Sequence, residues 1–454
     1  MVEMGLDLGL GLGGGGGVFS AEYGVAWNQT TDAYTRLGYA PFVATALGVK
    51  PTDYLFPFST RRCVVSDAGV VQYYLSPTDS TKKADGSSAG LTGTDGQVMV
   101  EISAKYIKYS WVDPVHSWWI SNVALPGYTL HPAFSSASGK VYVGAYEGYI
   151  TGGKLTSISG VLPTVSQTRA QFRAAAAARG AGWHQQSFWI ADLLQRLYVI
   201  EYADLDSQAM LGRGIDQYSI WPGTPQALTG NTNAIGNASG SNSAAVLVWA
   251  AATAKTSGQL VTPTVANNYT YRCTTGGTTG GSQPTWPTTI GATVADGSVV
   301  WTCVRIGQYV SYRGVENLFG HIWRFVDGIN IHNSAANRSR AYVCADPASF
   351  ADDTETNYSL AGILAEMDGY ARNLAATALG LFLPGGTSGG SSATGLADYY
   401  YTYFDNGNDS GWRVCRLGGY ASNGLGAGAF VWDSYSGSSA ASSDIGGRLC
   451  FTKT

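Results

Sequence analysis

The chain has 454 residues, a formal net charge of -4 and only 13% charged residues. This length exceeds what one hydrophobic core usually organises, so we expect two or three compact units. No basic stripe is present, which argues against nucleic-acid binding, and no apolar run of about 18 residues predicts a membrane span. The 60 glycines and 28 tyrosines are typical of short strands joined by turns and of tyrosine-rich binding surfaces.

Residues 1–18 are a low-complexity Gly-Leu segment that we expect to be a flexible leader. Acidic residues precede its apolar stretch, so it does not fit a signal peptide. Its G-x-G-x-x-G spacing (Gly9, Gly11, Gly14) is attributed to composition, because no strand precedes it and no βαβ unit follows.

Region 19–108 is predicted to be rich in β-strands, and alternation in GQVMVEISAKYIKYSWV (96–112) predicts a half-buried strand pair. In region 109–245, Thr168 can cap an Ala-rich helix that stops at Gly180, and apolar residues at helical spacing follow in 188–200. Two helices within a β-type sequence predict an α+β architecture with helices packed on a sheet.

Residues 246–306 alternate Thr, Val and aromatic residues between Gly and Pro turns. They predict a small inserted β module of roughly 60 residues. The remaining part, 307–454, resumes aromatic-rich strands and Gly/Ser loops. Cys273 and Cys303, like Cys415 and Cys450, flank short β segments, and we favour reduced thiols over disulfides.

No pattern in the chain predicts a metal or cofactor. The histidines show neither H-x-x-x-H nor Cys/His zinc spacing, so packed core histidines are favoured over metal ligands or bases. They are His116, His131, His184, His321 and His332. The cluster Asp405, Asn406, Asn408 and Asp409 lacks the glycine and glutamate of a calcium loop, which favours an Asx turn and leaves calcium binding as an alternative.

Catalytic patterns are equally weak. Gly386-Thr387-Ser388-Gly389-Gly390 matches the nucleophile-elbow string, but it lies in a Gly/Ser loop rather than a strand-to-helix turn. The acids Glu201, Asp204, Asp206 and Asp353 show no spacing that singles out a glycosidase pair. We therefore expect a protein that is not an enzyme.

The C-terminal run 412–451 carries a family resemblance in Arg416, Gly418-Gly419, Ala427-Gly428-Ala429-Phe430 and Ile445-Gly446-Gly447-Arg448. It resembles the formylglycine-generating-enzyme-like branch of the C-type-lectin fold, and within it the phage variable proteins diversified by retroelements. Segments 125–134, 143–160 and 316–331 are similar to phage structural proteins of that fold. The resemblance covers about 105–245 and 307–454.

This resemblance implies a C-type-lectin-like α+β fold, with two helices packed on a twisted antiparallel sheet. The β-rich N-terminal region and the inserted module would be additions to it. The oxidase members carry two cysteines after the Gly-Gly pair, whereas Tyr420 to Phe430 contains none. Copper-thiolate chemistry therefore has no ligands here, and the scaffold is expected to display a binding face.

By position, the resemblance implies a variable ligand-binding face on the last strands. Its residues would be Tyr420, Ser422, Asn423, Leu425, Val431, Asp433, Tyr435, Ser436, Ser438, Ser443 and Asp444. Tyr420 and Tyr435 would be the aromatic anchors. The framework between them is expected to be buried or turn-forming and comprises Gly418, Gly428, Phe430, Trp432, Ile445 and Arg448.

We thus expect a receptor-binding protein on a phage or prophage virion, made in the host cytoplasm without a signal peptide. Its partners would be a bacterial cell-surface protein or glycan and other virion tail proteins, in a homotrimer that gains avidity from multivalency. The alternatives are a structural tail, collar or decoration protein without ligand specificity, and a surface-polysaccharide hydrolase.

Overall fold

The computed structural model describes residues 22–38, 60–135, 139–216, 227–242, 246–265, 267, 269–289, 291–304, 309–335, 338–404 and 410–453. The predicted leader 1–18 and the Asx cluster Asp405, Asn406, Asn408 and Asp409 lie outside these residues. Within them, no helix is long and apolar enough to cross a bilayer.

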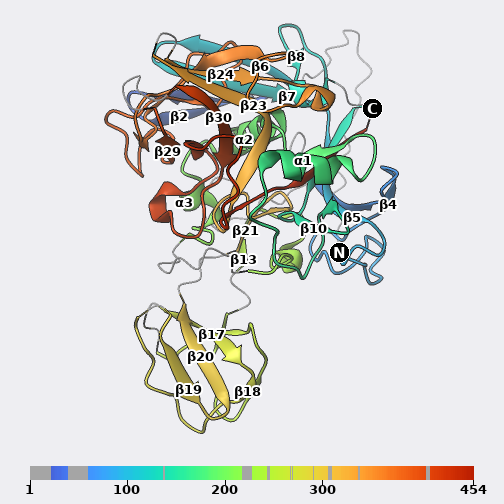
Figure 1. Cartoon of the computed structure of the whole chain (residues 1–454), viewed down its shortest axis with the longest axis vertical. Helices are drawn as coiled ribbons and strands as arrows, with labels where there is room; N and C mark the ends of the chain where they lie inside the picture. The colour runs from blue at the N-terminus through green and yellow to red at the C-terminus, as the bar shows by residue number, and fades with distance from the viewer. Residues whose placement is uncertain are drawn as a thin grey trace, which may run out of the picture.

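The predicted fold class is wrong. Among the described residues 39% are in strands and 11% in helices, so the protein is mainly β, with many small sheets. It is not an α+β arrangement with two helices layered on one antiparallel sheet, as the C-type-lectin resemblance implied. The physical reason is that the two helices do not form a layer: they lie at different places among several sheets (Figure 1).

An antiparallel five-stranded sheet contains the first described strands, in the order β2-β1-β7-β6-β8. Its strands are β1 (Glu22–Asn28), β2 (Ala33–Gly38), β6 (Tyr106–Val112), β7 (Val115–Ser121) and β8 (Thr129–Leu130). β6 crosses residue 108, where we placed a boundary between two regions.

A six-stranded sheet joins both ends of the chain, in the order β12-β33-β9-β5-β3-β4. Its strands are β3 (Thr60–Val65), β4 (Val71–Tyr74), β5 (Gln97–Ser103), β9 (Lys140–Gly144), β12 (Trp183–Gln185) and β33 (Leu449–Thr452). The predicted strand pair in 96–112 therefore exists as two strands that do not pair with each other. β5 pairs with β3 and β9 and is buried along almost its whole length, which alternation alone did not indicate.

The largest sheet has eight strands, in the order β25-β24-β23-β30-β31-β29-β26, with β32 paired to β23. They are β23 (Trp323–Ser334), β24 (Arg338–Val343), β25 (Ser359–Ile363), β26 (Gly369–Tyr370), β29 (Tyr399–Thr402), β30 (Gly411–Leu417), β31 (Trp432–Ser434) and β32 (Ile445–Gly446). All residues of the predicted binding face lie on or between its last strands.

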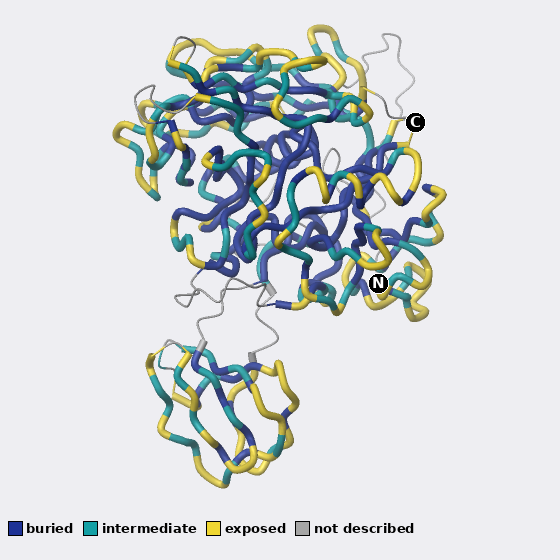
Figure 2. Tube along the Cα trace, in the orientation of Figure 1, coloured by how far each residue is buried: buried dark blue, intermediate teal, exposed yellow. Residues whose placement is uncertain are grey.

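Three α-helices occur in the described part of the chain: α1 (Arg169–Ala177), α2 (Phe188–Tyr202) and α3 (Ser207–Leu211). The two predicted helices, α1 and α2, are therefore present. All 15 residues of α2 are buried, and it contacts β1 and β7 of one sheet and β23 of another. In Figure 2 the interior of the protein around α2 is drawn as a dark blue tube, the colour of buried residues. α2 is thus a core element between sheets rather than a surface layer.

Residues 246–304 form their own five-stranded sheet, in the order β14-β16-β17-β20-β19 (Figure 1). Its strands are β14 (Val246–Val248), β16 (Leu260–Thr262), β17 (Thr270–Thr275), β19 (Thr293–Asp296) and β20 (Val299–Val304); β15 (Ala254–Lys255) pairs with β18 (Gly277–Thr278). Asp296 Oδ2 accepts the indole N–H groups of Trp249 and Trp301 at 2.7 and 2.8 Å, which ties the two large rings of this small core together.

Short elements complete the fold. The paired strands are β10 (Tyr149–Thr151) with β11 (Lys154–Thr156), β21 (Tyr309–Tyr312) with β13 (Gly240–Asn242) and β22 (Val315–Glu316), and β27 (Asn373–Leu374) with β28 (Pro384–Gly386). The 3-10 turns are η2 (Pro132–Phe134), η3 (Asn233–Ile235), η4 (Pro347–Ser349) and η5 (Gly424–Gly426).

The cap that predicted α1 provides a direct test of local stability. The Thr168 hydroxyl accepts the Gln171 N–H, and the Gln171 side chain accepts the Thr168 N–H at 2.8 Å, which forms a capping box. We expect Thr168→Ala to lower the free energy of unfolding by about 1 kcal/mol in denaturant titrations. Thr168→Ser keeps the hydroxyl and should therefore retain most of the parent's stability. Equal losses of stability in the two variants would contradict the role of this hydrogen bond.

Candidate binding face

The structure separates the eleven predicted binding residues by exposure. Three are buried: Val431 (0% exposed), Asp433 (4%) and Asp444 (9%). Those that are half-buried are Tyr420, Asn423, Ser436, Ser438 and Ser443, and those that are exposed are Ser422, Leu425 and Tyr435. Val431 packs in a hydrophobic cluster with Trp323 and Phe325, so its assignment as a ligand contact is corrected to a core residue.

Tyr420 joins a group of half-buried tyrosines at one end of the eight-stranded sheet. We call Tyr370, Tyr399, Tyr401 and Tyr420 the tyrosine face. The Tyr399 and Tyr401 ring centroids are 4.5 Å apart, and those of Tyr370 and Tyr399 are 5.2 Å apart. Trp323, only 3% exposed, supports the group: its ring stacks on Tyr420 at 6.2 Å and meets Tyr401 edge-on at 5.6 Å.

The loop that carries Tyr420 is fixed by hydrogen bonds at its base. The Tyr420 N–H donates to Asn423 Oδ1 at 2.7 Å, and Asn423 Nδ2 donates to the Tyr401 hydroxyl at 2.8 Å. One residue further, the Gly424 N–H donates to the backbone oxygen of Asp216 at 2.8 Å. Asn423, predicted as a contact residue, thus links the loop to the tyrosine face, so these rings are held in position before any ligand arrives.

Carboxylates accompany the tyrosines. Asp433, paired with Tyr401 across β31 and β29, binds the Arg416 guanidinium at 2.6 Å. Burial raises the pKa of Asp433 even so, and the charge of Asp444 adds to the rise. The pKa of Asp368 is likewise raised, first by partial burial and then by Asp433. The tyrosine face therefore lies beside three carboxylates and one guanidinium.

The expected framework residues are all buried: Gly418, Gly428, Phe430, Trp432, Ile445 and Arg448. At Gly428 the close approach of Asp398 requires the glycine, because a Cβ atom would lie 1.9 Å from the Asp398 carboxylate. That carboxylate accepts the Phe430 N–H at 2.6 Å. The framework therefore fixes the path of the chain between Tyr420 and Asp433.

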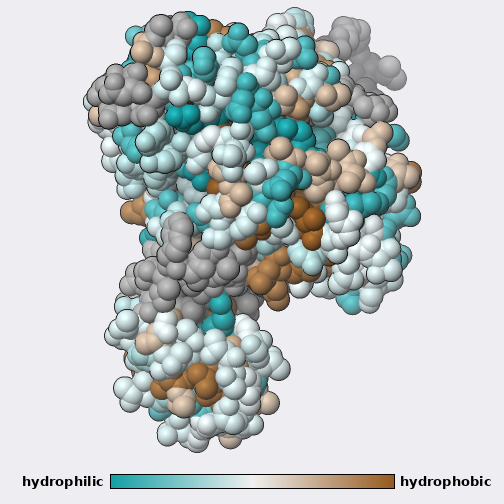
Figure 3. Space-filling view, viewed as in Figure 1, coloured by the Kyte–Doolittle hydropathy of each residue, from teal (hydrophilic) through white to brown (hydrophobic). Residues whose placement is uncertain are grey.

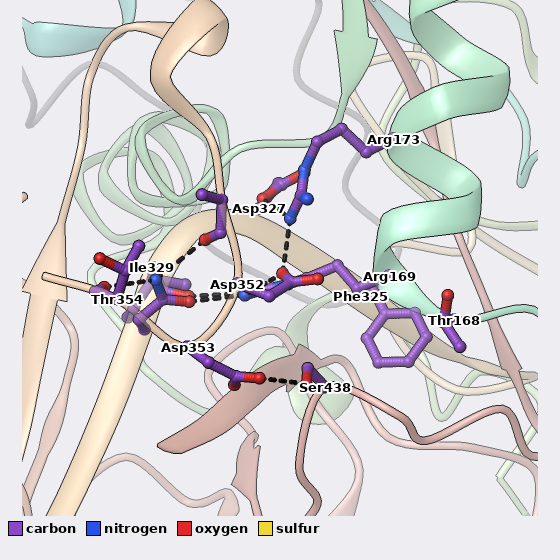
Figure 4. Close-up of polar contacts among 12 residues, drawn as sticks. Thr168, Arg169, Arg173, Phe325, Asp327, Ile329, Asp352, Asp353, Thr354 and Ser438 are labelled. Carbon is purple, nitrogen blue, oxygen red and sulfur yellow. Dashed lines mark hydrogen bonds and ion pairs between the residues drawn. The ribbon is translucent and has the colours of Figure 1, made fainter. Parts of the chain in front are cut away.

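The second predicted anchor, Tyr435, is not part of the tyrosine face. Its ring, 47% exposed, packs edge-on against Tyr403 at 4.6 Å. Further along this loop, the Ser438 hydroxyl donates to Asp353 at 2.5 Å, as Figure 4 shows. The loop 435–444 is therefore tied to the loop that follows η4, and the two predicted anchors lie in different aromatic groups.

The ion-pair network in Figure 4 connects the loop around Asp353 to α1. Arg169 on α1 is fully buried and donates to Asp352 and to the backbone oxygen of Ile329, at 2.7 and 2.6 Å. Arg173, one turn later, donates to Asp327 at 2.7 Å and to Asp352 at 2.6 Å. The guanidinium groups of Arg169 and Arg173 are both bound to protein atoms, so this network stabilises the fold.

Sequence reasoning missed Tyr370, Tyr399, Tyr401, Trp323 and Asp368. One signal was available for part of this set: the run Asp398 to Phe404 reads DYYYTYF. In a strand, alternate residues share a side, so Tyr399 and Tyr401 would lie together with Tyr400 opposite. The structure has this arrangement, because Tyr400 is 1% exposed while its two neighbours are half-buried.

His116, His131, His184 and His321 occupy core positions, whereas His332 on β23 is half-buried. His131 Nε2 lies 2.9 Å from Asp192 and His321 Nδ1 lies 2.5 Å from Glu147, with all four residues at most 3% exposed. No group of three or more His, Cys, Asp or Glu side chains in the described ranges is placed to hold a metal ion. Ser388 follows β28 and is not followed by a helix, so the nucleophile-elbow geometry is lacking there.

All six cysteines are buried free thiols: Cys63, Cys273, Cys303, Cys344, Cys415 and Cys450. Burial raises the pKa of Cys415 and of Cys450 to about 12, which keeps both thiols protonated and unreactive at neutral pH.

No protein-family model and no curated protein sequence matches this chain.

Proposed function

We propose that this chain is a non-enzymatic attachment protein that binds a bacterial cell-surface ligand through its tyrosine face. The observation that carries the proposal is the tyrosine face itself: half-exposed rings held in fixed positions by Trp323 and Asn423. Tyrosines of this kind supply a large amphipathic contact area at low entropic cost, as they do in antibody paratopes.

The wider surface agrees with this role. In Figure 3 most of the visible surface is pale, because few residues are charged and the brown apolar patches are small. A binding protein needs tolerant, exposed loops on a rigid support, and Ser422 and Leu425 are exposed between buried framework residues. Display on a phage virion and assembly as a homotrimer remain predictions, and both rest on the sequence resemblance.

The test is binding of the full-length protein to a panel of bacterial cells, beside Tyr399→Ala/Tyr420→Ala. Removal of an aromatic anchor typically costs about 2 kcal/mol, so the loss of two corresponds to roughly a thousandfold in affinity when the two costs add. We expect the double variant to lose cell binding while it keeps the circular dichroism spectrum and the oligomeric state of the parent.

Trp111→Ala is the matched control. Trp111 is an exposed aromatic residue, 48% accessible, on β6 of the five-stranded sheet, so its loss should leave cell binding intact. Equal binding by the parent and the tyrosine variant would contradict the proposal. Absence of binding by the parent to every strain would favour a structural virion protein instead.

A further inference from the structure

Two of the carboxylates beside the tyrosine face have no cationic partner. Asp433 is neutralised by Arg416, but neither Asp368 nor Asp444 forms an ion pair within the described ranges. Asp368 accepts one backbone hydrogen bond, from the Thr402 N–H at 2.5 Å. With its acids ionised, this end of the sheet therefore carries two more negative charges than positive ones.

Asp444 is the unusual member of the group. It is 9% exposed, and its Oδ1 atom is enclosed without a hydrogen-bond partner among the described residues. A buried carboxylate oxygen without a donor is costly, so such a group commonly indicates a missing water, ion or ligand. The backbone oxygen of Asp444 accepts the Trp323 N–H at 2.9 Å, which places this residue directly beside the tryptophan that supports the tyrosine face.

The charges and the rings lie close enough to influence one another. Burial and then the charge of Asp444 raise the pKa of Tyr420, and Asp368 has the same effect on Tyr399. Backbone hydrogen bonds place both acids beside the tyrosine face: Asp444 accepts the Trp323 N–H through its backbone oxygen, and the Asp368 carboxylate accepts the Thr402 N–H, next to Tyr401. An aromatic ring face attracts a cation through its quadrupole, and a nearby unpaired carboxylate adds a charge-assisted hydrogen bond.

We propose that the tyrosine face selects an ammonium-bearing sugar, with its amine beside Asp368 or Asp444 and the pyranose C–H face against the rings. The inference rests on the proposed function of this face and adds the chemical class of its ligand. A sugar is favoured over a lysine-bearing peptide because the half-buried aromatic rings offer apolar contact to the C–H face of a pyranose. An anionic glycan is disfavoured by the unpaired carboxylates.

The test compares two probes with identical rings and different charge. Glucosamine hexamer carries free amines, and N-acetylglucosamine hexamer is neutral. Binding of each to the full-length protein is measured by calorimetry at pH 6 and low salt, beside lysine hexapeptide. We expect the glucosamine hexamer to bind at least about tenfold more tightly than the acetylated hexamer, with a preference that weakens as salt screens the charges.

Two isosteric variants locate the selectivity. Asp368→Asn/Asp444→Asn removes both charges, while Asn keeps an oxygen that can accept the Thr402 N–H; we expect the tenfold preference to vanish. Asp85→Asn, in an exposed turn where the carboxylate accepts the Ser87 N–H and hydroxyl, should leave the preference unchanged. Tyr399→Ala/Tyr420→Ala should abolish binding of both sugars.

Each of the other possible outcomes would overturn a specific part of the proposal. Equal, tyrosine-dependent binding of both sugars would overturn charge selection and leave the binding face in place. Tighter binding of lysine hexapeptide would overturn the choice of a sugar. Tyrosine-dependent binding to cells without binding of any probe would overturn the ligand class. Cell binding that does not depend on the tyrosines would refute the proposed function and, with it, this inference.

Discussion

Asp192→Ala is expected to destabilise the protein by about 3–5 kcal/mol, because it leaves a buried guanidinium without its counter-charge. Asp192 lies on α2 and is fully buried, with Arg196 one turn later at 3.2 Å and His131 at 2.9 Å. Burial opposes its ionisation, yet Arg196 and His131 hold the pKa of Asp192 below its usual value. The loss should appear in urea unfolding followed by circular dichroism.

A double variant separates the lost charge pair from the lost packing. In Asp192→Leu/Arg196→Met the ion pair is replaced by apolar side chains of similar size, which in other proteins is neutral or even stabilising. We expect this variant to be more stable than Asp192→Ala, although it carries one more substitution. Asp85→Ala, in an exposed turn, should not shift the unfolding midpoint. A loss under 1 kcal/mol for Asp192→Ala would contradict the argument.

The second large effect is acid destabilisation from buried neutral histidines. His116 lies between Trp111 and Trp118, with ring centroids 5.7 and 5.5 Å away, and its Nδ1 and Nε2 atoms contact Tyr109 and Gln29. Burial lowers the pKa of His116 to about 4. Burial also lowers the pKa of His131 and of His184, so the folded state disfavours the protonated form of all three histidines.

The direction in which stability changes with pH follows from proton binding. Between about pH 6.5 and 4 the unfolded chain binds a proton at His116 and the folded chain does not, so stability falls as the pH falls, and the lowered pKa values of His131 and His184 act in the same direction. A shift of this size at His116 alone corresponds to about 3 kcal/mol at most. Hydrogen exchange of peptides from β6 and β7 at pH 7 and pH 4.5 measures the change. His116→Gln should flatten this pH dependence, and an unchanged slope would contradict the assignment.

Local patterns in the sequence predicted local structure. The helix α1 follows from the Thr168 cap and the alanine-rich run, and α2 from apolar residues at helical spacing. Both depend on interactions between residues only a few positions apart, which a sequence displays directly. The low charge and abundant tyrosine fit a binding surface and a loop-rich β protein equally well, so composition did not distinguish the two.

Long-range pairing decided what the sequence could not. β5 and β6 are adjacent in the chain and belong to different sheets, and α2 is buried on all sides instead of covering one sheet. These facts, with the dominance of strands, overturned the predicted C-type-lectin architecture. Register and partner choice depend on contacts between residues hundreds of positions apart, and an alternating pattern carries no information on which strand lies beside it.

The candidate site shows the same division. Its residue types could be read from the chain: the run at 398–404 is rich in tyrosine, and Tyr420, Asp433 and Asp444 were among the predicted contacts. Their grouping could not. Tyr399 contacts Tyr401, and Tyr401 and Tyr420 both contact Trp323 from β23, while the same packing buries Val431. The sequence by itself determined that the protein has many aromatic and some acidic side chains. Only the tertiary structure decided which of them are exposed next to one another, because the exposure of a side chain depends on all the residues that pack around it.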